Sequence, residues 1–315
     1  MSIPKVTIVI PVYNGARYLR EAIDSALAQT FKDIEVIVVN DGSSDGGKTE
    51  EIALSYGTAI RYFRKENGGV ASALNIGIRE MKGDYFSWLS HDDVFYVDKI
   101  AAQLSFLDSS GSIPDTILYG DYDIINSKSE FTGSIKIDAP KPERMCFALM
   151  VSYPIHGCTT LIPRSCFEKE GLFDEKLRTT QDYDLWFRFA GLFPFVHQAK
   201  SLIKSRHHEA QGTITMNKLH MLEVDKLLSI FVNEISPEEL VGGYGGTLPH
   251  AYAYVAESFY GRKCLGAANQ ARKRAFQSLE VLTLTMKWKL FFRLSLMEVK
   301  GRLCALLGSN NSVRG

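Results

Sequence analysis

Two adjacent carboxylates, Asp92 and Asp93, follow a short apolar run at Tyr85–Leu89. The run is aromatic and almost uncharged, which predicts a strand covered on both faces of a sheet. In an open α/β sheet, ligands bind at the carboxyl ends of the strands. Two carboxylates at that edge suit a hard divalent cation that bridges phosphate oxygens. The alternative is that Asp93 only caps a helix that starts near Val97, while Asp92 is solvated.

Three other polar positions could carry chemistry. Asp41 lies in the loop 40–47, whose small polar residues can bring backbone N–H groups close to a ligand. Asp182 lies near the start of a predicted helix, where a carboxylate gains from the helix dipole and could simply be a cap. Paired histidines at 207–208 indicate a ligand or an acid-base group, or else a solvated loop.

The elements that position these residues alternate between strand and helix over residues 5–110. Predicted strands fall at 6–10, 34–39, 60–63 and 85–89, with helical segments between them. This order predicts a parallel, doubly wound sheet with right-handed crossovers. No Gly-x-Gly-x-x-Gly follows the first strand, which disfavours a dinucleotide fold of the dehydrogenase type.

After residue 110 the alternation breaks down. We predict strands at 117–125, 156–164 and 195–205, an antiparallel hairpin within 126–139, and a helix at 181–189. Beyond Thr215 the chain is predicted to be helical, with breaks at Pro237, at Gly242–Gly246 and at Gly261.

Composition places the chain among ordinary globular proteins. Its 315 residues are 45% hydrophobic and carry a formal net charge of +0, so nucleic acid is not expected as a partner. The charge is uneven, because residues 251–315 hold 11 Lys or Arg against 3 Asp or Glu. The five cysteines include no Cys-x-x-Cys pair, which predicts neither a disulfide framework nor a zinc cluster and fits a reducing cytoplasm.

No segment of the sequence is predicted to span a membrane. Residues 1–5 lack the apolar core of a signal peptide, and Lys287, Lys289 and Arg293 interrupt the richest apolar window. We therefore expect a cytoplasmic protein, either free or bound at the inner face of the membrane.

Together, these segments resemble the family-2 glycosyltransferases of the GT-A fold over about residues 5–213. The matching motifs, in chain order, are Pro-Val-Tyr-Asn at 11–14, Asn-Asp-Gly-Ser-Ser-Asp at 40–45, the segment 67–75, Asp92-Asp93, Gly171–Glu175 and Gln181-Asp182. The resemblance implies a GT-A catalytic domain at 1–214, with a Rossmann-like, mainly parallel sheet flanked by helices. Within it, a nucleotide-binding half would cover about 1–110 and an acceptor half about 111–214, followed by a helical region at 215–315.

The implied activity is that of an inverting, hexosyltransferase-type enzyme. A sugar would pass from a nucleotide diphosphate, with UDP expected, to a hydroxyl of a glycan or of a lipid-linked or protein-linked saccharide. By resemblance Asp182 is the general base that takes the acceptor proton. Asp93 matches the metal-binding member of the family's Asp-x-Asp-type motif, and the cation would be Mn²⁺ or Mg²⁺.

The same resemblance implies a nucleotide site. Asp41 would hydrogen-bond the base or ribose, Tyr13 would pack on the uracil, and Asp92 would contact the ribose hydroxyls or the metal. His208 lies where some relatives place a histidine near the metal or the diphosphate, and imidazole is an acceptable Mn²⁺ ligand. The matching motifs add three further nucleotide-binding candidates, Pro11, Asn14 and Asn67.

Three departures from the family pattern keep other functions open. His91 stands where many relatives have an acidic residue, Gln181 replaces a Glu before the base, and Leu74 replaces an Arg. The alternative is a catalytically inactive, glycosyltransferase-like module that binds nucleotide sugar or a partner. A nucleotidyltransferase would also use a metal, but the chain lacks its Gly/Arg/Lys-rich loop near the N-terminus.

The last predicted helix carries an apolar stripe with basic flanks at residues 280–308. One interpretation is peripheral contact with an anionic membrane surface, where a lipid-linked acceptor would be found. The other is that this helix packs on the catalytic domain or on a second subunit, which would make a homodimer.

Overall fold

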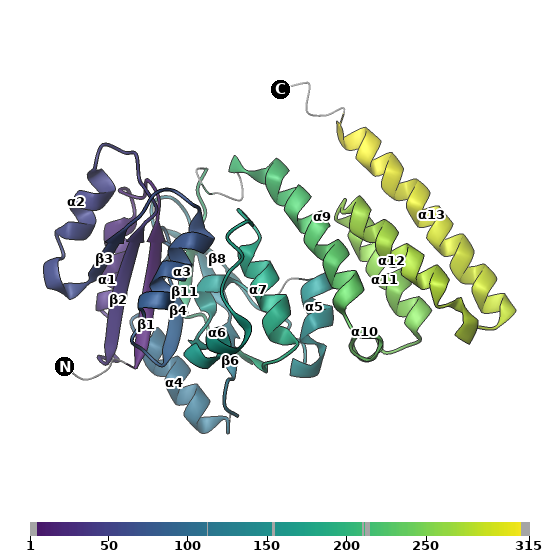
Figure 1. Cartoon of the computed structure of the whole chain (residues 1–315), viewed down its shortest axis with the longest axis horizontal. Helices are drawn as coiled ribbons and strands as arrows, with labels where there is room; N and C mark the ends of the chain where they lie inside the picture. The colour runs from purple at the N-terminus through teal and green to yellow at the C-terminus, as the bar shows by residue number, and fades with distance from the viewer. Residues whose placement is uncertain (1–4, 112, 153–154, 210, 212–214, 310–315) are drawn as a thin grey trace. The chain divides into compact units, whose positions relative to one another are not determined.

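A computed structural model describes residues 5–111, 113–152, 155–209, 211 and 215–309. Contacts divide the chain into two compact units. The first comprises Met1–Ala139 and Pro154–Thr215, and the second comprises Pro140–Tyr153 and Met216–Gly315. Residues 140–153 thus group with the C-terminal helices, although they precede the predicted boundary at 214 in the chain. Figure 1 follows the chain through both units in colour.

The first unit is built on a five-stranded sheet of order β3-β2-β1-β4-β9. Its strands are β1 (Val6–Val12), β2 (Ile34–Asn40), β3 (Arg61–Arg64), β4 (Tyr85–Trp88) and β9 (Ile162–Pro163). The first four pair in parallel and β9 is antiparallel to β4. The predicted mainly parallel sheet is therefore confirmed, and β1 and β2 lie side by side at its centre with β4 (Figure 1).

Helices and short 3₁₀ turns lie between these strands in the chain or follow the last of them. They are α1 (Leu19–Leu27), α2 (Lys48–Leu54), η1 (Gly57–Ala59), α3 (Val70–Glu80), α4 (Lys99–Ser109), η3 (Gly157–Thr159), α6 (Arg164–Glu170) and α7 (Gln181–Ala190). The β1 strand is buried along its whole length, as a central strand covered on both faces must be. A Cβ on Gly77 of α3 would lie 2.3 Å from Val9 Cγ1, so glycine permits the close packing of α3 on β1.

Two smaller sheets correct two of the predicted strands and the limits of the predicted hairpin. They contain β5 (Val94–Phe95), β6 (Ile117–Gly120), β7 (Tyr122–Ile125), β8 (Phe131–Ile135), β10 (Phe195–Gln198) and β11 (Ile203–Arg206). The β10 strand pairs with β6, and the other sheet has the order β5-β11-β7-β8. The predicted hairpin is the antiparallel β7–β8 pair, so it begins at residue 122 rather than at 126.

The predicted strand 117–125 is two strands in two sheets, separated at Asp121. The buried Asp121 carboxylate accepts a hydrogen bond from the Ile137 amide and bonds His197, which fixes the chain at this point. The predicted strand 195–205 is divided in the same way, into β10 and β11. At 156–164 only the last part is a strand, because local bonds such as Thr159 Oγ1 to the His156 carbonyl favour a turn.

The second unit is helical. Its helices are η2 (Pro142–Arg144), α5 (Met145–Val151), α9 (Asn217–Glu234), α10 (Pro237–Tyr244), α11 (Leu248–Gly261), α12 (Leu265–Gln277), η4 (Leu279–Val281) and α13 (Leu284–Ser309). The predicted breaks are confirmed, and α10 begins at Pro237 because Ser236 and Glu239 form a capping box. Figure 1 shows α11, α12 and α13 side by side. None of the helices in the described part of the chain has the length and apolar character that crossing a membrane requires.

Candidate active site

The loops after β1 and β2 bind each other through short polar side chains. The Asn14 side-chain oxygen accepts a hydrogen bond from the Ser44 amide at 2.8 Å, and the Asn14 amide donates to Ser43 Oγ at 2.9 Å. Asn14 has a φ of 50°, a left-handed conformation that asparagine tolerates. Tyr13 is 46% exposed beside this junction, so its ring is available to a ligand, whereas Pro11 is buried within β1.

Asp41, the residue after β2, is buried and organises the next loop. Its carboxylate accepts hydrogen bonds from the amides of Gly68 and Gly69, at 2.9 and 2.7 Å, and forms an ion pair with Lys65 at 2.7 Å. Its main-chain oxygen accepts from the Asn67 side chain. Asp41 therefore fixes the loop that precedes α3 and leaves part of its hydrogen-bonding capacity for a ligand.

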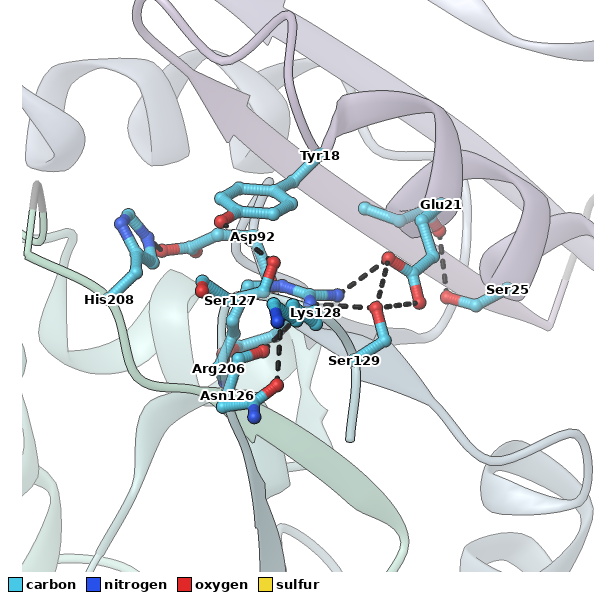
Figure 2. Close-up of polar contacts among 12 residues, drawn as sticks. Tyr18, Glu21, Ser25, Asp92, Asn126, Ser127, Lys128, Ser129, Arg206 and His208 are labelled. Carbon is cyan, nitrogen blue, oxygen red and sulfur yellow. Dashed lines mark hydrogen bonds and ion pairs between the residues drawn. The ribbon is translucent and has the colours of Figure 1, made fainter. Parts of the chain in front are cut away.

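Asp92 and His208 meet at the end of β4. Asp92 Oδ2 lies 2.9 Å from His208 Nε2, and both side chains are about nine-tenths buried, at 12% and 10% exposure. The His208 ring packs against the Tyr18 ring, with centroids 5.1 Å apart. Figure 2 shows this carboxylate and imidazole directed toward each other from distant segments of the chain.

Asp93 has different partners from its neighbour. Its Oδ1 accepts a hydrogen bond from the Arg206 amide at 2.9 Å, and its carboxylate groups with His156 and Cys158. Burial, together with the charge of Asp92, raises the pKa of the Asp93 carboxyl to about 8. His208 thus hydrogen-bonds Asp92, while Asp93 contacts Arg206 and groups with His156 and Cys158. The prediction that Asp93 and His208 bind a cation stays a prediction.

Arg206, the last residue of β11, connects the segments around this pair. Its fully buried guanidinium donates to the Asp92 carbonyl at 2.7 Å and to Ser129 Oγ at 2.8 Å, and it forms an ion pair with Glu21 of α1 at 2.6 Å. It also lies over the Tyr18 ring, 4.4 Å from the centroid. Figure 2 shows these contacts converging on one side chain. Arg206 holds the main chain of Asp92 and lies two residues before His208.

Asp182 lies in the first turn of α7, where Oδ1 accepts a hydrogen bond from the Tyr183 amide at 2.9 Å. The segment before α7 is anchored to the loop that precedes α3 and to α3 itself. Arg178 donates to the Gly68 carbonyl at 2.8 Å, and Asn75 of α3 exchanges hydrogen bonds with the Phe173 main chain. These bonds tie the segment leading to Asp182 to the loop that Asp41 organises.

Sequence reasoning gave no role to several residues that build this site. They are Tyr18, Glu21, Lys65, Ser129, His156, Cys158 and Arg206. The role of Arg206 could have been suspected from the sequence, because it is the first residue of the Arg-x-His pattern that contains His208. The partners of Arg206 had none, since Glu21 and Ser129 come from segments that only tertiary structure places together.

Comparison with known proteins identifies the class to which this fold and site belong. The family model described as Glycosyl transferase family 2 matches residues 7–170, about half of the chain. An uncharacterized glycosyltransferase of Rickettsia felis is 51% identical over 241 residues, which cover 76% of this chain and 40% of that protein. The chain thus spans about two fifths of the length of this relative.

Solved structures agree on the fold. S. aureus TarS 1–349 in complex with UDP has a TM-score of 0.60 at 15% identity, covering 87% of this chain and 88% of that chain. A mannosyltransferase from Pyrobaculum calidifontis, in complex with GDP-Man and Mn²⁺, has a TM-score of 0.55 at 16% identity, covering 97% and 88%. The chain belongs to glycosyltransferase family 2, and both the predicted family and the predicted GT-A fold are confirmed.

Proposed function

We propose that the chain transfers a sugar from a nucleotide diphosphate sugar to an acceptor hydroxyl, with inversion at the anomeric carbon and with the help of a divalent cation. The observation that carries this proposal is the Asp92–His208 pair at the carboxyl end of β4, within a family-2 fold. Ligands of open α/β sheets bind at that edge.

The Asp92–His208 pair fits a Mn²⁺ or Mg²⁺ ion. On an octahedral ion with bonds of about 2.1 Å, neighbouring ligand atoms lie roughly 3 Å apart. The two side-chain atoms are already 2.9 Å apart, and carboxylate with imidazole is a donor set that Mn²⁺ accepts. When bound, the cation would stabilise the negative charge that develops on the departing diphosphate. Buried Asp93 would then hold the main chain of Arg206, which in turn bonds the Asp92 carbonyl, rather than bind this ion.

The loops after β1 and β2 are proposed to bind the nucleotide. Tyr13 offers an exposed ring for stacking on a base, and Asp41 with Asn67 offers polar contacts to the base or ribose. We propose UDP as the nucleotide, which is the ligand of the S. aureus TarS structure, while GDP-Man is the ligand of the mannosyltransferase.

Asp182 is proposed as the general base. Its carboxylate would accept the proton of the acceptor hydroxyl as that oxygen bonds to the anomeric carbon. The bond from that carbon to the diphosphate oxygen breaks on the opposite face, which inverts the configuration. A glycan or a lipid-linked or protein-linked saccharide would supply the hydroxyl.

Calorimetric titration with UDP, with and without Mn²⁺, tests the donor site. We expect wild-type binding to require the cation and Asp92→Asn to lose it, since one of the two ligating side chains no longer carries charge. Asp108→Asn, which alters an exposed carboxylate on α4, is the matched control and should bind as the wild type does. Absence of binding with UDP, GDP and dTDP alike would contradict the proposal.

Hydrolysis of the donor sugar separates catalysis from binding. Asp182→Asn should bind UDP normally and lose about 10²- to 10⁴-fold in turnover, the usual contribution of a general base. Asp184→Asn, two residues along α7, is the control, because Asp184 is paired with Arg188. Binding without turnover in the wild type would favour the inactive, nucleotide-sugar-binding module instead.

We also propose that α13 contacts an anionic membrane surface. Leu290 and Leu294 are buried against the neighbouring helices of the second unit, whereas another face of α13 is exposed. The exposed large apolar residues in the described part of α13 are Leu284, Met286, Trp288, Phe291, Phe292, Leu296 and Val299. Successive helical residues lie roughly 100° apart, so all of these except Met286 fill an arc of roughly 140°.

The charge around this face favours lipid over a second copy of the chain. Lys289 lies at one edge of the apolar arc, and Arg293 on the same side forms an ion pair with Glu257. Residues 251–315 hold 11 Lys or Arg against 3 Asp or Glu. Basic edges attract anionic headgroups, whereas two such faces would repel each other.

Flotation with phosphatidylserine-containing vesicles, compared with neutral vesicles, tests this contact. The full chain should float only with the anionic vesicles, and the double variant Trp288→Glu/Phe292→Glu should stay in solution. Leu54→Glu, at an exposed apolar position of α2, is the control and should float. If the double variant instead dissociates a dimer on gel filtration, the face belongs to a second subunit.

A further inference from the structure

Asp93, His156 and Cys158 form a cluster of three different metal-binding side chains. One carboxylate oxygen, one imidazole nitrogen and the thiol sulfur lie within 4.8 Å of one another. Asp93 and Cys158 are almost fully buried, at 4% and 1% exposure. The ligands come from two distant segments, so the spacing of cysteines in the sequence gave no sign of the cluster.

We propose that this cluster is a second cation site, which binds a thiophilic ion of the Zn²⁺ type. Carboxylate, imidazole and thiolate are the ligands that Zn²⁺ takes in proteins, and three of them leave a fourth position for water or substrate. In a tetrahedral site with bonds of about 2.0–2.3 Å, ligand atoms lie roughly 3.3–3.8 Å apart. Closing the cluster around the ion therefore needs side-chain movements of about 1 Å. As the sulfur–zinc bond forms, the thiol proton leaves to solvent.

The surroundings of His156 suit a metal ligand. One ring nitrogen lies 3.1 Å from Ser205 Oγ, and the other accepts a hydrogen bond from the Cys158 amide at 3.3 Å. Whichever nitrogen binds the ion, the other keeps a partner that fixes the plane of the ring. The Tyr122 ring also packs on the imidazole, with centroids 4.8 Å apart.

Hydrogen bonds also support the other two ligands. The amide and hydroxyl of Ser90 each lie 3.3 Å from Cys158 Sγ, where they can stabilise a thiolate. The Arg206 amide bonds Asp93 Oδ1, and the carboxylate also accepts a hydrogen bond from the Cys158 thiol, a bond that is released for an ion when the thiol proton leaves. Outer hydrogen bonds of this kind orient metal ligands and raise affinity.

The turn that carries two of the ligands is held against the end of β4. A Cβ on Gly157 would lie 2.4 Å from Cζ3 of Trp88, so only glycine lets the turn approach this ring. Because β4 leads to Asp93, the same packing sets the third ligand beside the other two. The cluster is therefore part of a fixed framework of main chain.

The effect on sugar transfer rests on the proposed function. An ion held by Asp93 would lie beside Asp92, which we assign to the catalytic cation, and two cations so close repel each other. Zn²⁺ should therefore inhibit transfer in the presence of Mn²⁺. Binding of Zn²⁺ itself does not depend on that assignment.

Titration of the full chain with Co²⁺ tests the site, because a cobalt–thiolate bond gives a charge-transfer absorption that oxygen and nitrogen ligands do not. The wild type should develop this band at one equivalent and lose it when Zn²⁺ is added. Cys158→Ser should lack the band, whereas Cys166→Ser, which removes an equally buried thiol on α6, should keep it. His156→Gln should weaken Co²⁺ binding at least tenfold.

Absence of the band in the wild type, or its persistence in Cys158→Ser, would overturn the second site and leave a hydrogen-bonded polar cluster. UDP binding with Mn²⁺ is measured on the same samples. A cobalt band without UDP binding would support the cluster and contradict the proposed function, and the opposite result would contradict only the cluster.

Discussion

The sheet edge of the first unit and the α13 surface of the second unit distribute polarity in opposite ways. At the sheet edge, the charged side chain of Arg206 is fully buried and bonded to three distant segments. On α13, the large apolar side chains of Trp288 and Phe292 are 56% and 66% exposed. A buried charge must have partners, whereas an exposed apolar face gains by acquiring one. The buried charge has its partners within the chain, whereas the exposed apolar face is the one for which we propose a membrane partner.

Replacement of Arg206 should cause a larger loss of stability than the other substitutions proposed here. Arg206→Met should lower the free energy of unfolding by about 3–5 kcal/mol, because it leaves buried carbonyls and Glu21 without their partner. Arg206→Lys keeps the charge but loses the forked geometry, and should recover only part of the loss. Urea unfolding measures the stability, and Mn²⁺ titration in the presence of UDP measures the site.

Arg188 of α7 provides the control for Arg206. It forms an ion pair with Asp184 at 3.0 Å, and its side chain is 25% exposed. Its other hydrogen bonds go to the main chain of Glu170 and Leu172, not to Asp92 or His208. Arg188→Met should destabilise the fold without changing the Mn²⁺ concentration needed for UDP binding. Equal Mn²⁺ affinities in the Arg206 and Arg188 variants would show that Arg206 is only a structural residue.

Two leucines on α13 differ in burial and should differ in their contribution to stability. Leu294 is 0% exposed and Leu296 is 58% exposed, only two residues apart. Leu294→Ala should cost about 3 kcal/mol through lost burial and a cavity, whereas Leu296→Ala should stay within about 0.5 kcal/mol. Thermal unfolding of both variants decides this, and equal losses would mean that the exposed face is covered in solution.

A buried lysine should make the stability of the fold depend on pH. Lys99 is 0% exposed, and burial lowers the pKa of its ammonium group to about 7. Between pH 7 and its unfolded pKa near 10.5, the unfolded chain binds the proton and the folded chain does not. Stability should therefore rise with pH across this window, by at most about 1.4 kcal/mol per unit.

Urea unfolding at pH 7, 8 and 9 measures this slope, with Lys99→Met as the comparison. The variant should lack the rise that this one proton produces. Parallel stability curves for the two proteins would mean that Lys99 stays charged in the fold, held by Ser87 and Gln103.

The alternation of strands and helices before residue 110 could be predicted because each element there is periodic and bounded by turn residues. The strands after residue 110 could not be placed as well, because their limits depend on partners. Asp121 ends β6 through bonds to Ile137 and His197, and neither is adjacent in the chain. The local sequence around Asp121 cannot predict contacts with residues so distant in the chain.

The candidate site shows the same division. The sequence indicated Asp41, Asp92 and Asp182, each next to the end or start of a regular element. It assigned His208 and Asp93 to one metal, but the structure pairs His208 with Asp92 and groups Asp93 with His156 and Cys158. The catalytic and binding roles of these residues stay predictions that the experiments above address.

The family, the GT-A fold and the order of the motifs follow from the sequence alone, because they depend on local periodicity and on residue types at fixed spacing. The partners of the two adjacent carboxylates follow only from the folded structure. Neighbouring side chains in a tight turn point in different directions, and the turn is fixed by Arg206, whose ion-pair partner Glu21 lies 185 residues away. Contacts over such separations form only when the whole sheet closes, so no local pattern can contain them.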